Sequence, residues 1–478
     1  MTKSWIAAFL GLVAFYYAIP QLSITDSRYV IATADLLLRT GRLDLRPLVR
    51  ADTDLPLPLD NLLLVAAVDL APGIVVAAKA AGVEPLGKGG VVDYYLPYDL
   101  INHVPDGAAA ISVATLPPVL PLFPTWPSFA AMPISLATAA LGGSVFDGSA
   151  FRADRNALYQ KIAAAVLAAA AVAFFNAAAR CFLARPYALG LSAWLASGPL
   201  VSSTSRALWS DSFALPLSFA GLYIFTRVIL AGRPMRHWPI MLAAVLSFAF
   251  MMKPVYAIPG AMLGLLVLAA PGLPPRLKVS FVAVCAVLAA LFVATSLLIY
   301  GDMLPPYFAP SRVGSFELSR LAGVLFSPSR GVLWFAPSLL VACCTPLLVR
   351  RDRRLFVTSV AAVAAVVVAL LTVSDFDKWW GGWSFGPRLL QFALPATALL
   401  ALVFVRAASR RRGRERIAIL ILCMAIAEWE GVVHVSGVMS GRGWEWNTTP
   451  VDVDLAPQRL WDWSDPQFLA AFRKVAPA

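Results

Sequence analysis

The chain has 478 residues, of which 59% are hydrophobic and 14% are charged, and its formal net charge is +12. A soluble globular domain carries about 25% charged residues, so this composition excludes an ordinary soluble protein and indicates a membrane protein. Much of the positive charge lies in two clusters, RRDRR (350–354) and RAASRRRGRER (406–416). Such clusters are typical of cytoplasmic loops between membrane spans, and we expect no nucleic-acid partner.

Apolar runs long enough to cross a bilayer recur along the chain. The first covers 4–22 and has no A-x-A-like cleavage site after it, so we interpret it as an uncleaved anchor. We predict an all-α polytopic protein with about 11–13 transmembrane helices over 1–438 and a short tail over 439–478 without a separate soluble domain. The other predicted runs are 159–180, 187–202, 211–229, 238–252, 255–270, 279–299, 330–349, 355–373, 389–405 and 417–438.

The Lys/Arg bias of the loops predicts the orientation of these spans. If both arginine clusters are cytoplasmic, the N-terminus is cytoplasmic and the tail is periplasmic, in a bacterial inner membrane. The loops that then face outward are 23–107, 203–210, 300–329 and 374–388. Within 105–158, the runs 108–124 and 127–143 form either a pair of short spans or a re-entrant hairpin, and we favour the pair.

The first outer loop opens with SITDSRYVIATADLLLRTG (23–41). Its apolar residues follow an i, i+1, i+4, i+7, i+8 pattern, which predicts an amphipathic helix over 27–40 that is too short to span and lies in the membrane interface. Asp35 and Arg39 form an i,i+4 pair on the polar face, and Gly41 is suited to end the helix. Asp26 precedes the helix, either as its N-cap or as an ionised base, and one carboxylate can fill both roles.

Four cations lie where an outer loop meets a span: Arg206, Lys253, Arg330 and Arg388. A guanidinium offers a planar pair of donors to phosphate, although border cations also extend to lipid head groups. In the WWGGW motif, Trp379, Trp380 and Trp383 either stack on a sugar or form an interfacial aromatic belt. Tyr307 belongs to an outer loop that we expect to border the same cavity. His103 and His434 are solitary and are interpreted as structural, so we predict no metal ligands.

The first span, the loop that opens with Asp26 and the Y…A…LL..G helix resemble the C-type (GT-C) glycosyltransferases, a superfamily that includes protein mannosyltransferases and aminoarabinose transferases. Further blocks resemble a bacterial branch of these enzymes whose substrates are largely unassigned. These blocks are STSRALWSDSFALPLSFAGLYIF (203–225), GVLFSPSRGVLWFAPSLL (323–340), WWGGWSFGPRLLQFALP (379–395) and PQRLWDWSDPQFL (457–469). Members often carry a second acidic residue beside the first, whereas Ser27 stands there in this chain.

The resemblance implies a glycosyltransferase of the cell envelope that moves a hexosyl or pentosyl group from a polyprenyl-phosphate-linked donor to a hydroxyl of a glycan, lipid or peptide, with inversion. It assigns Asp26 as the general base, and Asp99 and Asp211 are second candidates. The four border cations would bind the donor phosphate, while Tyr29, Tyr307 and the three tryptophans would contact sugar or acceptor. Membrane lipids are expected partners, no cofactor is specified, and a divalent metal is neither required nor indicated.

Three other functions fit the sequence. A multi-span transporter or flippase of a lipid-linked or small polar substrate is the first, but it predicts internal repeats with broken helices, which we do not find. A lipid-linked glycan polymerase or ligase would use a polyprenyl diphosphate donor. A non-catalytic assembly subunit would tolerate loss of the Asp26 carboxylate.

Overall fold

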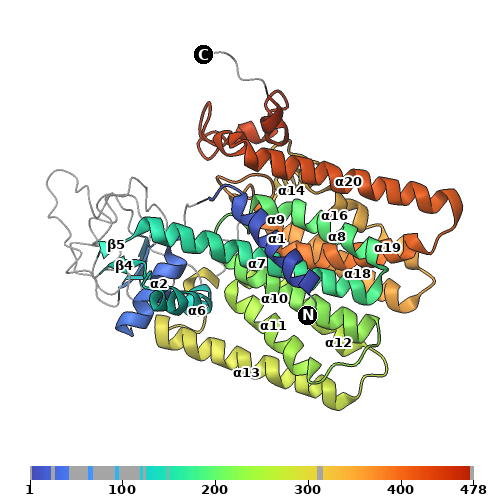
Figure 1. The fold of residues 1–478 in the computed structure, drawn as a ribbon, viewed down its shortest axis with the longest axis horizontal. Coiled ribbons are helices and arrows are strands. Elements are labelled where there is room, and N and C mark those ends of the chain that lie inside the picture. The colour runs from blue at the N-terminus through green and yellow to red at the C-terminus, as the bar shows by residue number, and fades with distance from the viewer. Residues whose placement is uncertain are drawn as a thin grey trace.

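The computed structural model describes residues 3–22, 27–41, 63–67, 92–95, 119–121, 125–147, 150–308 and 316–473. Within these ranges the molecule is an elongated bundle of helices (Figure 1). Six of the described helices are long and apolar enough to cross a membrane, and shorter apolar helices accompany them. The predicted all-α polytopic class is therefore confirmed. The six are Ala153–Phe182, Ser210–Leu230, Pro275–Tyr300, Arg353–Ser374, Arg388–Ser409 and Gly413–Met439.

Every apolar run beyond 150 coincides with helix, but two runs are interrupted by proline. The run 187–202 divides into α8 and α9 at Pro199, and the run 330–349 divides into α15, α16 and α17. Proline lacks an amide hydrogen and clashes with the preceding turn, so a helix cannot continue through it unchanged. The helices from α7 onward are α7 (Ala153–Phe182), α8 (Arg185–Ser197), α9 (Pro199–Ser202), α10 (Ser210–Phe225) with η2 (Thr226–Leu230), α11 (Trp238–Met252), η3 (Pro254–Tyr256), α12 (Ala257–Ala269), α13 (Pro275–Tyr300), η4 (Pro306–Phe308), α14 (Leu318–Phe326), α15 (Val332–Phe335), α16 (Pro337–Ala342), α17 (Thr345–Val349), α18 (Arg353–Ser374), η6 (Arg388–Ala393), α19 (Leu394–Ser409) and α20 (Gly413–Met439).

Helix α7 is the centre of the packing. It contacts α10, α8 and α1 (Lys3–Ala18), while α10 also packs on α11 and α11 on α13. The buried side of α7 is rich in alanine, including Ala164, Ala165, Ala168 and Ala169. Small residues let helix backbones approach closely within a bilayer, where burial of apolar surface alone does not drive association. Figure 1 shows α13 at one edge of the bundle and α20 at the other.

The amphipathic helix is present as α2 (Ser27–Thr40) and ends at Gly41, whose φ is 65° and whose amide donates to the Leu37 carbonyl at 2.9 Å. The predicted Asp35–Arg39 ion pair is also present, at 2.9 Å. Its environment differs from the prediction, because Asp35 is only 3% exposed and accepts a hydrogen bond from Ser144 Oγ at 2.9 Å. Helix α2 packs against α6 (Trp126–Ala140) and α7, so protein covers a face that we expected to be polar and open.

The prediction of a spanning helix over 108–124 is wrong in its described part. Residues Val119–Pro121 form strand β3, which pairs antiparallel with β1 (Leu63–Ala67); β1 pairs in turn with β2 (Val92–Tyr95). The second run, 127–143, is helical as α6, but α6 has only 15 residues and is packed on α2. A short ribbon follows, β4 (Phe146–Asp147) with β5 (Ala150–Phe151). Apolarity alone could not distinguish a short buried strand from a span.

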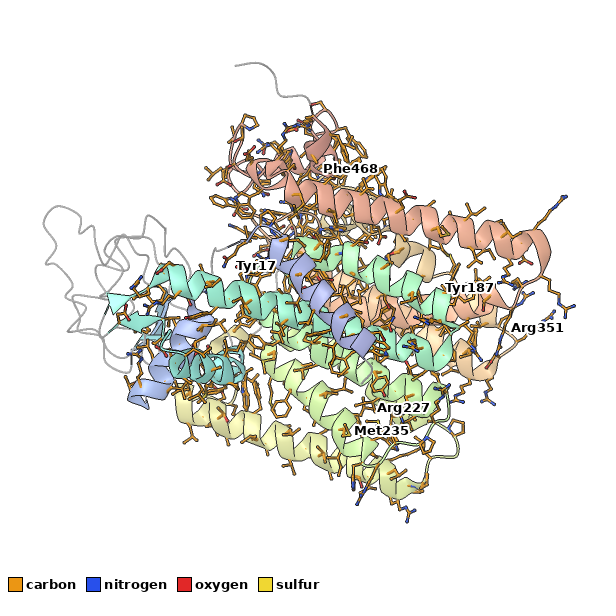
Figure 2. All side chains as sticks on the ribbon, in the orientation of Figure 1. Tyr17, Tyr187, Arg227, Met235, Arg351 and Phe468 are labelled. Atoms are coloured by element: carbon orange, nitrogen blue, oxygen red, sulfur yellow. The ribbon has the colours of Figure 1, made fainter. Side chains whose placement is uncertain are left out.

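The described tail packs against the C-terminal part of α20. It contains α21 (Arg442–Glu445), η7 (Pro457–Trp461) and η8 (Gln467–Phe472), and η8 packs against α20. Phe468 stacks on Trp334 with ring centroids 5.3 Å apart and an interplanar angle of 10°. Figure 2 shows Phe468 beside the end of α20, at the opposite end of that helix from the arginine-rich loop that contains Arg351.

Candidate active site

The end of the first apolar helix is fixed against the segment that precedes α10. The Leu22 amide donates to the Arg206 carbonyl at 3.0 Å, and Arg206 Nε donates to the Pro20 carbonyl at 3.1 Å. Leu22, Ala207 and Trp209 form a buried cluster, against which Trp444 packs. Residue 22 is four positions before Asp26, which itself lies outside the described residues, as do Asp99 and the side chain of Tyr29.

Two buried cations lie beneath this junction. Lys161 Nζ donates to the carbonyls of Tyr16, at 2.8 Å, and Ser205, at 3.0 Å, and it lies within electrostatic range of Arg206. Lys161 is 5% exposed and Arg206 4%, and burial lowers the pKa of Arg206 to about 10. Neither forms an ion pair with a carboxylate among the described residues. Two neighbouring buried cations favour an anion close by.

Sequence analysis did not identify Lys161. The available signal was its position inside an apolar run, because an ionisable group in a membrane segment is a functional candidate by default. Its neighbour Arg206 was proposed from its place at a loop border, and the structure brings both to the end of the first helix.

Asp211, in the first turn of α10, is the centre of a buried polar group. Its Oδ2 is 2.6 Å from Lys253 Nζ, and its Oδ1 accepts a hydrogen bond from Tyr256 Oη at 3.1 Å. Burial acts to lower the pKa of Lys253, but the Asp211 carboxylate outweighs it and holds the pKa above its ordinary value. Asp211 and Lys253, predicted as a reserve base and a phosphate ligand, are thus ion-paired with each other. Both Asp211 oxygens are engaged, which disfavours Asp211 as the base.

Arg388 lies next to this group. Its guanidinium carbon is 4.6 Å from the centre of the Trp209 ring, and it lies within electrostatic range of Lys253, as does Tyr307. Arg388 is half-buried, and no carboxylate or carbonyl in the described part of the chain accepts a hydrogen bond from its guanidinium. Within the described residues, nothing occupies the five N–H donors of this guanidinium. The structure brings together four of the predicted residues, Asp211, Lys253, Tyr307 and Arg388. Arg206 lies three residues before Trp209, on which the Arg388 guanidinium is placed.

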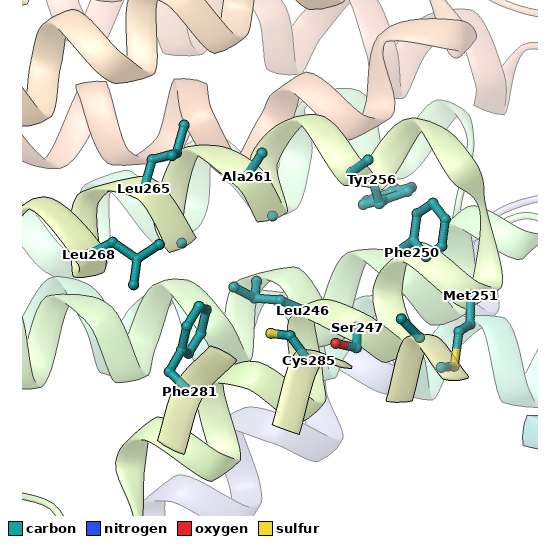
Figure 3. A pocket seen from close by; sticks show the side chains of 14 residues that line it. Leu246, Ser247, Phe250, Met251, Tyr256, Ala261, Leu265, Leu268, Phe281 and Cys285 are labelled. Atoms are coloured by element: carbon teal, nitrogen blue, oxygen red, sulfur yellow. The ribbon is translucent and has the colours of Figure 1, made fainter. Parts of the chain in front are cut away.

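An apolar groove of about 390 Å³ begins at the same place and runs between α11, α12 and α13. Tyr256 belongs both to the groove and to the polar group, since its hydroxyl donates to Asp211. Figure 3 shows Tyr256 and Phe250 at one end and Leu265, Leu268 and Phe281 at the other. Gly260 leaves room midway, because a Cβ there would come no closer than 4.0 Å to Leu246 Cβ. The remaining lining residues are Leu246, Ser247, Met251, Ala257, Ala261, Gly264, Cys285 and Ala289.

Arg330 has a different environment from the one predicted. It is 1% exposed; Nε donates to the Trp380 carbonyl at 3.0 Å, and Nη2 donates to Asn447 Oδ1 at 2.7 Å. Gln467 Oε1, the Ser329 carbonyl and the Gly382 carbonyl accept the remaining bonds. Burial lowers the pKa of Arg330 to about 9. This arginine ties the tail to the 379–386 loop, and with its donors so occupied it is not part of the phosphate site assembled here.

The three tryptophans of WWGGW differ in exposure and in contacts. Trp379 is 8% exposed and fills the space above Gly323, and Trp380 is 9% exposed and donates to Asp454 Oδ1 at 2.8 Å. Both therefore have packing roles. Trp383 is 36% exposed, and its ring lies edge-on to Trp444, which packs against the Leu22 cluster. Of the three, Trp383 is the most exposed.

Asn447 begins an Asn-Thr-Thr sequence but is fully buried, so its amide serves the Arg330 network rather than glycosylation. His434 is buried in α20, with Nε2 2.9 Å from the Phe335 carbonyl, in agreement with a structural role. Among the described residues, no group of three His, Cys, Asp or Glu side chains could hold a metal ion.

No protein-family model and no curated protein matches the sequence. Solved structures that are similar in fold include those of two membrane proteins. ArnT from Cupriavidus metallidurans bound to undecaprenyl phosphate is 15% identical over 98% of this chain and 76% of that chain, with a TM-score of 0.47. The archaeal oligosaccharyltransferase AglB from Archaeoglobus fulgidus, in complex with an inhibitory peptide and a dolichol-phosphate, is 10% identical over 100% of this chain and 62% of that chain, with a TM-score of 0.45. At these TM-scores neither likeness assigns a reaction, a substrate or a residue role to this chain.

Proposed function

We propose that the protein is a membrane glycosyltransferase that transfers a sugar from a polyprenyl-phosphate-linked donor to the hydroxyl of a glycan, lipid or peptide. The observation that carries the proposal is the junction of an apolar groove with a cationic pocket: Tyr256 lines the groove and donates to Asp211, while Lys253 and Arg388 lie at the same end. A lipid phosphate has the matching form, an isoprenoid chain ending in an anion.

In this proposal the isoprenoid chain enters the groove between α11, α12 and α13, and its phosphate meets Arg388. Arg388 is preferred as the direct ligand because its guanidinium has no competing acceptor among the described residues and is held over Trp209. Lys253 is paired with Asp211, so it would attract the phosphate electrostatically without leaving this ion pair. A guanidinium binds phosphate through two parallel hydrogen bonds, which also orients the donor.

Asp26 is the proposed general base. It would take the proton of the acceptor hydroxyl as that oxygen attacks the anomeric carbon, while the bond from that carbon to the phosphate oxygen breaks. The leaving group is polyprenyl phosphate, whose growing charge Arg388 would stabilise, with Arg206 and Lys161 as further cations near the end of the first helix. Single displacement inverts the anomeric centre, as in inverting glycosidases. The docking of Leu22 beside Arg206 and Trp209 supports this assignment, since it tethers the chain four residues before Asp26.

The chemistry is proposed to occur on the membrane face opposite the arginine-rich loops, which would make it periplasmic in an inner membrane. Support comes from the location of the arginines, since Arg351 lies at the far end of the bundle from the folded tail (Figure 2).

The decisive experiment follows the leaving group. Purified protein in detergent, given a polyprenyl-phosphate sugar labelled in the sugar and a mixture of envelope glycans, lipids and peptides, should release polyprenyl phosphate and label an acceptor. Asp26→Asn should reduce this release by about 10²–10⁴-fold, the usual contribution of a general base. Substrate uptake into proteoliposomes without any release of polyprenyl phosphate would identify a transporter instead.

A further inference from the structure

A second cavity lies on another side of the bundle and shares no residue with the groove. It has a volume of about 330 Å³ and is bounded by α8, α16, α19 and α20. Its lining is almost wholly apolar, with Leu191, Val341, Phe404, Leu420 and Met424 as its larger contributors. The remaining lining residues are Pro186, Tyr187, Gly190, Trp194, Ser338, Ala342, Ala401, Val405, Cys423, Ile426 and Ala427.

The cavity faces the apolar medium around the bundle. Only 22% of the apolar window of α20 is buried inside the protein, and Met424, which lines the cavity, is 70% exposed. On the opposite wall, Gly190 leaves open space, since a Cβ there would meet nothing within 4 Å. A span with so little protein around it is covered by lipid chains.

The end of the cavity near Trp194 offers no charge to a ligand, since none of the lining residues is charged. Glu430 lies behind it, fully buried, and accepts hydrogen bonds from Trp194 Nε1 and the Ser338 amide, each at 2.7 Å. Trp194 and Ser338 are themselves lining residues. Their donors are directed to the carboxylate behind the wall, so the cavity is suited to hydrocarbon.

The end of the cavity near Tyr187 is basic. Arg416 donates a hydrogen bond to the hydroxyl of the lining residue Tyr187, and Arg185 is two residues before Tyr187 and exposed. In the described part of the chain neither arginine forms an ion pair with a carboxylate; Glu415 pairs with Arg411 instead. Figure 2 shows Tyr187 toward the end of the bundle that carries Arg351. The mouth therefore combines an apolar entry with cations that have no carboxylate partner among the described residues.

We propose that this cavity binds one acyl chain of an anionic phospholipid, whose phosphate lies against Arg416 and Arg185 in the leaflet on the side of the arginine-rich loops. The apolar walls match the chain, and the cationic mouth matches the head group. The lining residues Tyr187, Gly190, Leu191 and Trp194 lie at i, i+3, i+4 and i+7, so they form one face of α8 along the cavity. This site does not depend on the proposed transferase reaction. It is a structural lipid site, separate from the groove proposed for the donor.

The test is native mass spectrometry of the full chain, purified in detergent and titrated with phosphatidylglycerol or with phosphatidylcholine of the same acyl chains. We expect wild type to bind one phosphatidylglycerol more tightly than it binds phosphatidylcholine. Arg416→Gln should weaken the phosphatidylglycerol affinity about fivefold, the usual effect of one basic residue near an anionic head group. Gly190→Leu, which projects into the open space, should weaken the binding of both lipids.

Gly260→Leu, in the other groove, is the matched control and should leave phosphatidylglycerol binding unchanged. The proposal is overturned if the two lipids bind wild type equally, if Gly190→Leu has no effect, or if Gly260→Leu weakens phosphatidylglycerol as much as Gly190→Leu does. It is also overturned if undecaprenyl phosphate displaces phosphatidylglycerol from wild type and from Gly260→Leu alike, because the cavity would then be a lipid-phosphate donor site.

Discussion

The molecule has two apolar cavities of similar volume whose polar ends differ. The groove between α11, α12 and α13 ends at a carboxylate, an ammonium and a phenol that bond to one another, with a guanidinium close by. The cavity between α8, α16, α19 and α20 ends at arginines that have no carboxylate partner in the described part of the chain, and the Glu430 carboxylate lies behind its wall. Similar apolar walls therefore end in different polar surroundings, and we propose a lipid-phosphate donor for the first cavity and an anionic phospholipid for the second.

The largest expected effect of a substitution is the loss of turnover in Asp26→Asn, which tests the reaction proposed at the groove. Asp26→Asn should lower the turnover number by the factor stated above while donor affinity stays near the wild-type value, since the amide keeps the size of the side chain but cannot accept the proton. Single-turnover release of polyprenyl phosphate and equilibrium donor binding would be measured on the same preparation. A turnover number that stays at the wild-type level would remove Asp26 from the reaction.

The next largest expected effect is a loss of folding stability when the Asp211–Lys253 ion pair at the Tyr256 end of the groove is broken. Lys253→Met leaves Asp211 without its cation in a buried environment, and removal of one partner of a buried pair costs about 3–5 kcal/mol. We expect a lower thermal midpoint in detergent, with much of the loss recovered in the Lys253→Met, Asp211→Asn double variant.

The matched variant is Arg416→Gln, which removes a cation without a carboxylate partner and should shift the midpoint by less than Lys253→Met does. Equal shifts for these two variants would show that the Asp211–Lys253 pair contributes no more to stability than a surface cation.

Arg388 should affect the donor but not the fold. Arg388→Ala removes charge-assisted hydrogen bonds worth about 1.5–3 kcal/mol, so donor affinity should fall about 10–100-fold with little change in thermal midpoint. Arg388→Lys should recover only part of the affinity because an ammonium lacks the planar fork. Donor binding by isothermal titration calorimetry decides the matter, and unchanged affinity in both variants would exclude Arg388 from the phosphate site.

The smallest expected effect is on donor affinity, and it distinguishes the two cavities because one glycine of each is replaced by leucine. Gly260→Leu should weaken binding of a long-chain polyprenyl-phosphate sugar about tenfold because the new side chain occupies space that the isoprenoid would fill, each lost methylene being worth about 0.8 kcal/mol. Gly190→Leu should leave donor binding unchanged. A donor analogue with a short chain should be insensitive to both substitutions, and an equal loss in both variants for the long-chain donor would show that the groove is not the chain site.

The sequence alone was sufficient for the class of protein, for the helical positions of the apolar runs beyond 150 and for the helix over 27–40, because these depend on local hydrophobicity, helical periodicity and a glycine at the end of the helix. It also singled out Arg206, Lys253 and Arg388 as candidates, since cations at the border of apolar runs stand out in the sequence. Only the tertiary structure decided their partners. Lys253 forms an ion pair with Asp211, and the Arg388 guanidinium lies over Trp209. Arg330 is buried among protein acceptors, and Lys161 lies near Arg206. The physical reason is that the state of a charged group depends on neighbours distant in sequence, and loop closure and helix packing set those neighbours without any local signal.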